Sequence, residues 1–281
     1  MARQIVACID GSASTQAVCD WAAWISVELQ SPLTLLHVLE RSRHPSEANL
    51  TGNIGIGSRE NLMEELVKLD EERSKLALAQ GKNLLESAKK RVESLNGGDV
   101  TTRQRHGSLI ETLTDMKDDI RLLVMGRQGS ETESDYDQIG SQLESVLRTL
   151  KRPILVALPQ FKEPKQVMIA YDASPTARKV LEMAARNPMM KGRPCHLVMV
   201  GGDAEALLQE GRSTLESAGH QVATAQLSGE VDAALWEYAL DHAIDLLIMG
   251  AYGHSRIRQF LVGSNTTKML HSAKIPLLFL R

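Results

Sequence analysis

The chain has 281 residues, of which 43% are hydrophobic, and its 32 lysines and arginines nearly balance its 35 aspartates and glutamates, for a formal net charge of −3. This length suits one large domain or two ordinary ones, and the hydrophobic fraction is that of a globular protein. The small net charge argues against a nucleic acid or an anionic membrane surface as a partner. No uninterrupted apolar run approaches the roughly 20 residues that cross a bilayer, so we expect no membrane span.

The cysteines and the first residues of the chain indicate a reducing compartment. Cys8, Cys19 and Cys195 are odd in number and widely spaced, and no two of them form a CxxC pair. Such cysteines are typical of buried thiols. The first residues lead straight into a strand-like run and carry no signal-peptide pattern. We therefore predict a cytoplasmic protein.

The first part of the chain alternates buried strands with amphipathic helices. Its first strand, Ile5–Ile9, ends in Asp10-Gly11-Ser12, and a helix follows from Ser14. The further expected strands are Pro32–Leu39, Asp99–Arg105, Ile120–Met125 and Pro153–Leu158, and the further expected helices are Glu60–Leu95, Ser108–Lys117 and Ile139–Leu150. Continuous apolar strands separated by helices predict a parallel sheet that is covered on both faces.

The segment from Arg41 to Ser58 interrupts this alternation. It is polar, includes the glycine-containing stretch Thr51–Gly57, and is long enough to indicate a functional or mobile loop. It either covers a ligand or lies on the surface as a plain loop, and the second interpretation is the simpler one. The helix Glu60–Leu95 that follows is longer than most crossover helices. We expect it to break near Gly81 and to present its charges as a solvated face.

After a linker at Pro159–Pro164, the same pattern begins again. Three stretches repeat earlier ones: Val167–Ser174 repeats Ile5–Ser12, Cys195–Val200 repeats Leu33–Val38, and Ile244–Gly250 repeats Ile120–Gly126. Internal repetition of this kind indicates repeated structural units. We predict an α/β protein of two tandem doubly wound domains, 1–158 and 166–281, each with a five-stranded parallel sheet and helices on both faces.

The stretch from Gly250 to Asn265 carries the most specific motif. Gly250 and Gly253 follow a predicted buried strand. After nine intervening residues, Gly263-Ser264-Asn265 precede a predicted helix. Glycines let a ligand approach the main chain closely, and Ser264 and Asn265 are good N-cap residues. Amides at a helix N-terminus and in a glycine-rich turn attract phosphate. The alternative is a strand–loop–helix turn in which the glycines serve geometry alone.

Charged side chains in the loop between these glycines add to the phosphate hypothesis. His254, Arg256 and Arg258 can place their charges against phosphate oxygens. For His254 a solvated side chain is an equally good interpretation. The other histidines are scattered without the spacing of metal ligands, so we expect no metal site built from histidine.

With both repeats laid out, the chain resembles the universal stress protein family in its tandem form. The resemblance rests on Gly-x2-Gly-x9-Gly-Ser at Gly250, Gly253, Gly263 and Ser264, supported by the aspartates that end the first strand of each half, Asp10 and Asp172. In this family the motif marks members that bind ATP. The resemblance implies that Ala170, Asp172 and Val200 lie near adenine and ribose. It also implies that Gly250, Gly253, Gly263, Ser264 and Asn265 hold the phosphates of ATP, or of AMP or ADP.

The first half departs from this motif. Ten residues, not nine, separate Gly129 from Gly140-Ser141, and they include Glu131, Glu133, Asp135 and Asp137. Carboxylates near a triphosphate oppose binding, by about 1 kcal/mol or more each in a partly solvated site. A bridging Mg²⁺ would reverse that effect, whereas the simpler interpretation is an acidic loop without a ligand. We predict one competent nucleotide site, in the second half, and one degenerate site.

No pair of residues stands out as nucleophile and base, so we assign no catalytic residue. The leading hypothesis is a stress-response protein that acts as a nucleotide-dependent regulator. The alternatives are a scaffold for an unknown protein partner that has lost nucleotide binding, and a slow adenine-nucleotide hydrolase. The apolar run Ile275–Leu280 predicts a final strand that needs a partner. Either the two halves pair with each other through it, or two chains form a homodimer.

Overall fold

A computed structural model describes residues 3–39, 56–95, 98–128, 141–202, 204–250 and 264–281. The first half contains β1 (Gln4–Cys8), α1 (Thr15–Leu29), β2 (Leu33–Leu39), α2 (Ile56–Ser94), β3 (Val100–His106), α3 (Leu109–Asp115), β4 (Ile120–Gly126), α4 (Ser141–Thr149) and β5 (Ile154–Ala157). The second half contains β6 (Val167–Ala170), α5 (Pro175–Ala185), η2 (Pro188–Met190), β7 (Cys195–Val200), α6 (Glu205–Ser217), β8 (Val222–Leu227), α7 (Val231–Asp241), β9 (Leu246–Gly250), α8 (Ser264–His271) and β10 (Leu277–Leu280).

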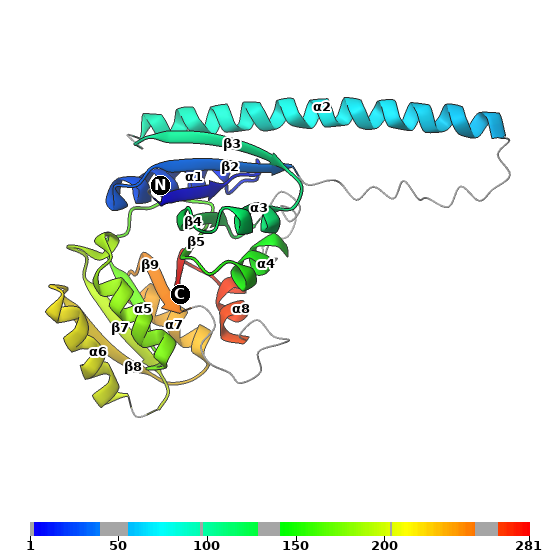
Figure 1. Cartoon of the computed structure of the whole chain (residues 1–281). Coiled ribbons are helices and arrows are strands. Elements are labelled where there is room, and N and C mark those ends of the chain that lie inside the picture. The colour runs from blue at the N-terminus through cyan, green and yellow to red at the C-terminus, as the bar shows by residue number, and fades with distance from the viewer. Residues whose placement is uncertain (1–2, 40–55, 96–97, 129–140, 203, 251–263) are drawn as a thin grey trace.

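All ten strands belong to one sheet in the order β3-β2-β1-β4-β5-β10-β9-β6-β7-β8 (Figure 1). Within each half the five strands run parallel, as the apolar runs predicted. The halves join where β10 pairs antiparallel with β5, with Leu278 opposite Leu155. The predicted α/β architecture is thus confirmed, and the two five-stranded blocks form a single ten-stranded sheet. Because the blocks run in opposite directions, their carboxyl-terminal edges lie on opposite sides of the sheet.

This pairing decides between the two expectations for the final strand. β10 lies between β9 and β5, and β5 lies between β4 and β10. The pairing of the two halves is confirmed. The homodimer through the last strand is wrong in its route, because both edges of β10 already carry hydrogen-bonded neighbours within the chain.

Alternation along the strands fills a hydrophobic core on each face of the sheet. In β1, Ile5 and Ala7 point to one core, whereas Val6 points to the other. The first core also takes side chains from α1, α2, α5 and α6, and the second takes them from α3, α4, α7 and α8. Both cores continue across the β5–β10 junction, so helices from the two halves cover each face together.

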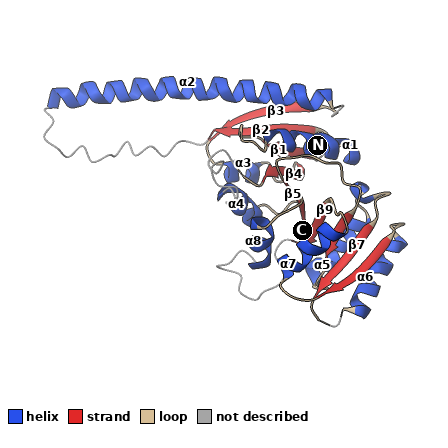
Figure 2. Cartoon of the chain, turned by 180° about the vertical axis from the view of Figure 1, so that it is seen from behind, coloured by secondary structure: helices blue, strands red, loops and turns tan. Residues whose placement is uncertain are grey.

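The helix α2 is one continuous helix of 39 residues, so the break expected near Gly81 is wrong. Gly81 marks the place where α2 meets the sheet: a Cβ added there would lie 2.7 Å from Cδ2 of His37 on β2. From Gly81 onward the helix buries Leu85, Ala88 and Val92. Before Gly81 it extends away from the rest of the protein, as Figure 1 and Figure 2 show from opposite sides. The stretch Thr51–Gly57 falls partly on α2, from Ile56, and partly outside the described residues.

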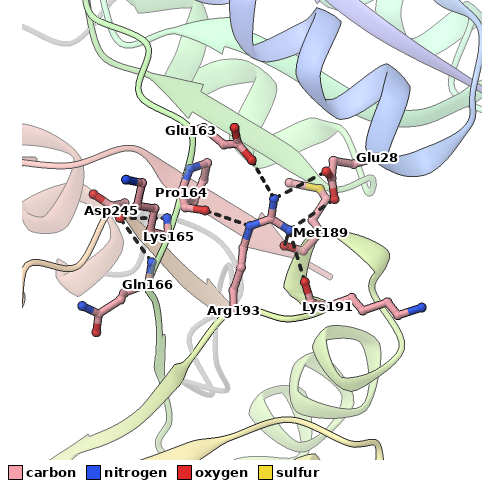
Figure 3. A network of polar contacts seen from close by, with 9 residues as sticks. All are labelled: Glu28, Glu163, Pro164, Lys165, Gln166, Met189, Lys191, Arg193 and Asp245. Atoms are coloured by element: carbon pink, nitrogen blue, oxygen red, sulfur yellow. Dashed lines mark hydrogen bonds and ion pairs between the residues drawn. The ribbon is translucent and has the colours of Figure 1, made fainter.

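An arginine clamp holds the linker and the second half against α1 (Figure 3). Arg193, just before β7, donates from Nε to the carbonyl of Pro164 at 2.8 Å and from Nη1 to the carbonyl of Met189 at 3.0 Å. Its guanidinium also pairs with Glu28 of α1 at 3.2 Å and with Glu163 at 3.1 Å. The Arg193 side chain is only 12% exposed. Most of its donors therefore depend on these acceptors and not on water.

A buried carboxylate fixes the end of the linker. Asp245, just before β9, accepts hydrogen bonds from the backbone amides of Lys165 at 2.8 Å and Gln166 at 3.2 Å, and pairs with Lys162 at 2.6 Å. Burial disfavours the carboxylate, but the hydrogen bonds from Lys162 and the two amides outweigh it, so the pKa of Asp245 lies below its ordinary value. The linker is therefore a bonded part of the fold.

We predict that Arg193→Gln lowers the free energy of unfolding by about 2 kcal/mol, because it leaves the partly buried carboxylate of Glu28 and two carbonyls without their donor. Chemical denaturation in urea measures the loss. Arg212→Gln is the matched control, since Arg212 pairs with Glu216 at a site where both side chains are 41% exposed, and such pairs contribute less than about 1 kcal/mol. Equal losses of unfolding free energy in the two variants would contradict the stabilising role of the Arg193 clamp.

Candidate functional site

The first strand of each half is followed by the same turn. Oδ1 of Asp172 accepts a hydrogen bond from the amide of Ser174 at 3.0 Å, and Oδ1 of Asp10 accepts one from the amide of Ser12 at 3.0 Å. The residue inside each turn is left-handed, with φ of 84° at Gly11 and 54° at Ala173. The aspartates that the sequence singled out therefore fold the backbone into an Asx turn at the end of β1 and of β6.

The turn in the second half leads directly into a capped helix. Oγ of Ser174 accepts a hydrogen bond from the amide of Ala177 at 3.1 Å, and Pro175 occupies the first turn of α5. Both features favour a helix that begins sharply after the strand. Asp172 is exposed beside this helix start. Its carboxylate therefore faces solvent at the carboxyl-terminal edge of β6.

Strand order brings four of the predicted site residues to one edge. β6 lies between β7 and β9, with Ala170 opposite Val198 on one side and Met249 on the other. Val200 and Gly250 end those two neighbouring strands, so both lie at the same edge as Ala170 and Asp172. The helix that follows β6, α5, packs on one face of the sheet, and the helix that precedes β9, α7, packs on the other. Ligands of doubly wound sheets bind at such switch points, outside the carboxyl ends of the strands.

The structure describes only some of the remaining predicted residues. Gly253, His254, Arg256, Arg258 and Gly263 lie outside the described residues. Ser264 is the first residue of α8 and Asn265 the second, so a helix begins where the motif predicted one.

The two halves differ at the glycine that ends β4 in the first half and β9 in the second. A Cβ added at Gly126, the end of β4, would lie 2.7 Å from Cβ of Ser14, and Ser14 is buried. A Cβ added at Gly250, the end of β9, would make only ordinary contacts, 3.6 Å from Cγ2 of Thr176 and 3.5 Å from Cγ2 of Val180. Thr176 occupies the position that matches Ser14, four residues after the aspartate of each turn. Within the described residues, which exclude 251–263, packing therefore requires a glycine at position 126 but not at position 250.

The described residues offer little for metal or redox chemistry. Among them no group of three or more His, Cys, Asp or Glu side chains is placed to hold a metal ion. Burial raises the pKa of Cys8, Cys19 and Cys195 to about 12, so these thiols stay protonated and unreactive at neutral pH. Among the same residues, no helix combines the length and the apolar character that crossing a membrane requires.

A histidine cluster at the other end of β7 was missed at the level of sequence. His196 bonds through Nδ1 to the hydroxyl of Tyr238 at 2.9 Å and through Nε2 to the side chain of Gln166 at 3.2 Å. The ring of His242 stacks on Tyr238, with centroids 3.9 Å apart. Burial, and then the neighbouring His242, lower the pKa of His196. The usable signal was the spacing of Tyr238 and His242, four residues apart and so on one helix face.

Left-handed backbone at a non-glycine residue costs free energy, roughly 1–2 kcal/mol. We predict that Ala173→Gly raises the free energy of unfolding by about 1 kcal/mol and that Gly11→Ala lowers it by a similar amount. A Cβ at Gly11 would meet its nearest neighbour, Cδ2 of Leu84, at an ordinary contact distance of 3.8 Å, so the change tests backbone strain alone. Thermal and urea unfolding of the pair measure both shifts, and shifts of the same sign would contradict the prediction.

A second prediction concerns His196. Its pKa in the folded protein lies below the ordinary value of 6.5, so folding favours the neutral ring. The corresponding stability is present above pH about 6.5 and is lost as the pH falls toward the lower, folded-state pKa. Urea denaturation between about pH 7.5 and 5.5 should show this decline, and His196→Asn should flatten it. An unchanged slope in the variant would assign the decline to other groups.

Comparison with known proteins places the chain among relatives of similar length. The profile of the Universal stress protein family matches residues 1–157 and 197–281. A relative from Synechocystis sp. (strain ATCC 27184 / PCC 6803 / Kazusa), universal stress protein Slr1230, is 33% identical over an alignment of 286 positions, which covers 99% of this chain and 100% of the relative.

Two solved structures resemble the whole chain. A universal stress protein from Archaeoglobus fulgidus DSM 4304 has a TM-score of 0.71 and 18% identity, covering 99% of this chain and 96% of that one. A functionally unknown protein from Pseudomonas aeruginosa PAO1 has a TM-score of 0.61 and 15% identity, covering 100% and 92%. At these identities the two structures support a common fold and nothing further.

Proposed function

The chain belongs to the universal stress protein family, and from that premise we propose that its second half, 166–281, binds an adenine nucleotide, foremost ATP, and acts as a nucleotide-dependent regulator in the cytoplasm. The first half, 1–158, is the degenerate partner. The observation that carries this proposal is the difference between Gly250 and Gly126. Packing against the described residues accounts for the glycine in the first half but not for the one in the second. Close approach of a ligand to the main chain would supply a reason for the second glycine.

The arrangement of the second half supports the position of each group. Ala170, Asp172 and Val200 end neighbouring strands, where adenine and ribose would lie, and Asp172 is exposed there. The start of α8 at Ser264 would present free amides to the phosphates. Gly253, Gly263 and Asn265, with His254 and Arg256 as cations, complete the proposed site.

A buried side chain and an acidic segment argue against the same ligand in the first half. Ser14 is 2% exposed and fills the space beside Gly126. The segment that would hold the phosphates carries Glu131, Glu133, Asp135 and Asp137. Carboxylates repel phosphate unless a divalent cation bridges them, so binding there would require Mg²⁺.

Relatives indicate the class of nucleotide without fixing it. One solved universal stress protein is a complex with cAMP, and another, from Archaeoglobus fulgidus, is a complex with dAMP. Each covers 43% of this chain. The proposal therefore rests on this chain's own residues, and Mg²⁺ would accompany ATP as it usually accompanies triphosphates.

We predict that Gly250→Ala keeps the free energy of unfolding within about 0.5 kcal/mol of the wild type but weakens ATP binding about tenfold or more, because the added Cβ stands where the nucleotide approaches. Gly126→Ala is the matched control. It should cost about 1–3 kcal/mol of stability through the contact with Ser14 and leave the affinity unchanged. Urea denaturation and isothermal titration with ATP, with and without Mg²⁺, give the two readouts.

A second prediction concerns the number of adenine nucleotides that each purified chain carries. Denaturing the purified chain and quantifying released adenine nucleotide should give near one per chain, and Gly263→Asp should give none, because its carboxylate would oppose the phosphates. Near two per chain would contradict the degenerate first half. No nucleotide, and no binding of added Mg-ATP, would favour a scaffold that works through protein partners, whereas repeated turnover to ADP would identify a slow hydrolase.

A further inference from the structure

The projecting part of α2 carries apolar side chains that the fold leaves uncovered. Leu66, Val67, Leu69, Leu76 and Leu78 are between 39% and 63% exposed. They form the densest group of exposed large hydrophobic side chains among the described residues, where the others are scattered over α1, α5, α7 and the end of the α2 region. Exposed apolar surface of this density is typical of a surface that another molecule covers.

Part of this group follows the spacing of a coiled coil. Leu66, Leu69, Arg73 and Leu76 are separated by three, four and three residues, and the sequence extends the same spacing back to Leu62. We call Leu66, Leu69, Arg73 and Leu76 the leucine seam. A repeat of alternating three and four residues places side chains in one stripe that a second helix can pack against. The side that docks on the sheet is a different one, defined by Gly81, Leu85, Ala88 and Val92.

The charges beside the leucine seam decide which occupant fits. Residues 65–80 carry four carboxylates, Glu65, Asp70, Glu71 and Glu72, against three cations, Lys68, Arg73 and Lys75. A slight excess of negative charge disfavours an anionic membrane or a nucleic acid. A second copy of the helix instead offers leucines to the leucines, and offers Asp70 and Glu72, which flank the seam, to the guanidinium of Arg73.

We propose that two copies of this protein associate through the leucine seam of α2. The part of α2 before Gly81 projects beyond the sheet (Figure 1). Leu66, Leu69 and Leu76 on that part are 39–63% exposed, so a second chain can reach the seam. Arg73 sits within an otherwise apolar stripe, where a single polar residue sets the register of pairing at some cost in affinity. The seam spans residues 66–76, about one and a half heptads, so the dimer is weak and dissociates on dilution. This interface takes the place of a dimer through β10, because both edges of β10 pair with strands of the same chain.

Sedimentation of the full chain across a wide dilution series tests this directly. The wild type should convert from monomer to dimer as concentration rises. Leu69→Glu and Leu76→Glu should each raise the dissociation constant at least about tenfold, since both remove a leucine that the dimer buries on each helix. Arg73→Leu should lower it, because the polar interruption of the seam is gone. These side chains are exposed in the single chain, so the circular dichroism and urea midpoint of the variants should match the wild type.

Leu240→Glu is the matched control, because Leu240 is 64% exposed but lies on α7, away from the seam. It should leave the dissociation constant unchanged. A wild type that stays monomeric at every concentration would overturn the proposal and leave the seam to a protein of another sequence. A dimer that Leu69→Glu and Leu76→Glu do not weaken would also overturn it. Binding of the wild type to anionic vesicles, lost in the two leucine variants, would assign the seam to a lipid surface instead.

Discussion

The antiparallel pairing of β5 with β10 sets the layout of the whole molecule. β5 and β10 are the edge strands of two parallel five-stranded blocks, and each supplies the hydrogen-bonded neighbour that the other block's edge lacks. That junction makes one sheet of ten strands from two repeats. It also turns the second block around, so that the strand ends of the two halves face opposite edges. The clamp of Arg193 and the continuous cores on both faces are further bonds across a boundary that this pairing creates.

The two halves keep the same turn and differ in what surrounds it. Asp10 and Asp172 hold equivalent turns, although one contains a glycine and the other a strained alanine. Past the turn the halves diverge, since α1 begins at Thr15 with Ser14 packed against Gly126, whereas α5 begins earlier, at Pro175, with its cap in place. This shift of two positions in the helix start places a buried serine beside Gly126, whereas the described neighbours of Gly250 make only ordinary contacts.

Local pattern in the sequence predicted most of the strands and helices, because continuous apolar runs and capping residues are local signals. The strand order places Ala170, Asp172, Val200 and Gly250 at one edge of the sheet, while their role in binding stays a prediction from the family resemblance. Non-local facts escaped the sequence. Three features depend on which elements become neighbours in the fold. These are the pairing of β10 within the chain or between chains, the contact of Gly81 with His37, and the contact of His196 with Tyr238. No spacing along the chain encodes such contacts.

The β5–β10 pairing also has a consequence for synthesis. Leu277 follows Ala157 by 120 residues, so β5 is made long before the strand that covers it. At about 5–20 residues per second, ribosomes take roughly 6–24 s over that interval. During this time the edge of Ile154-Leu155-Val156-Ala157 is apolar and bare of charge, which is the kind of edge that recruits strands from other chains. The interval between the two strands is therefore a period in which this apolar edge has no partner from its own chain.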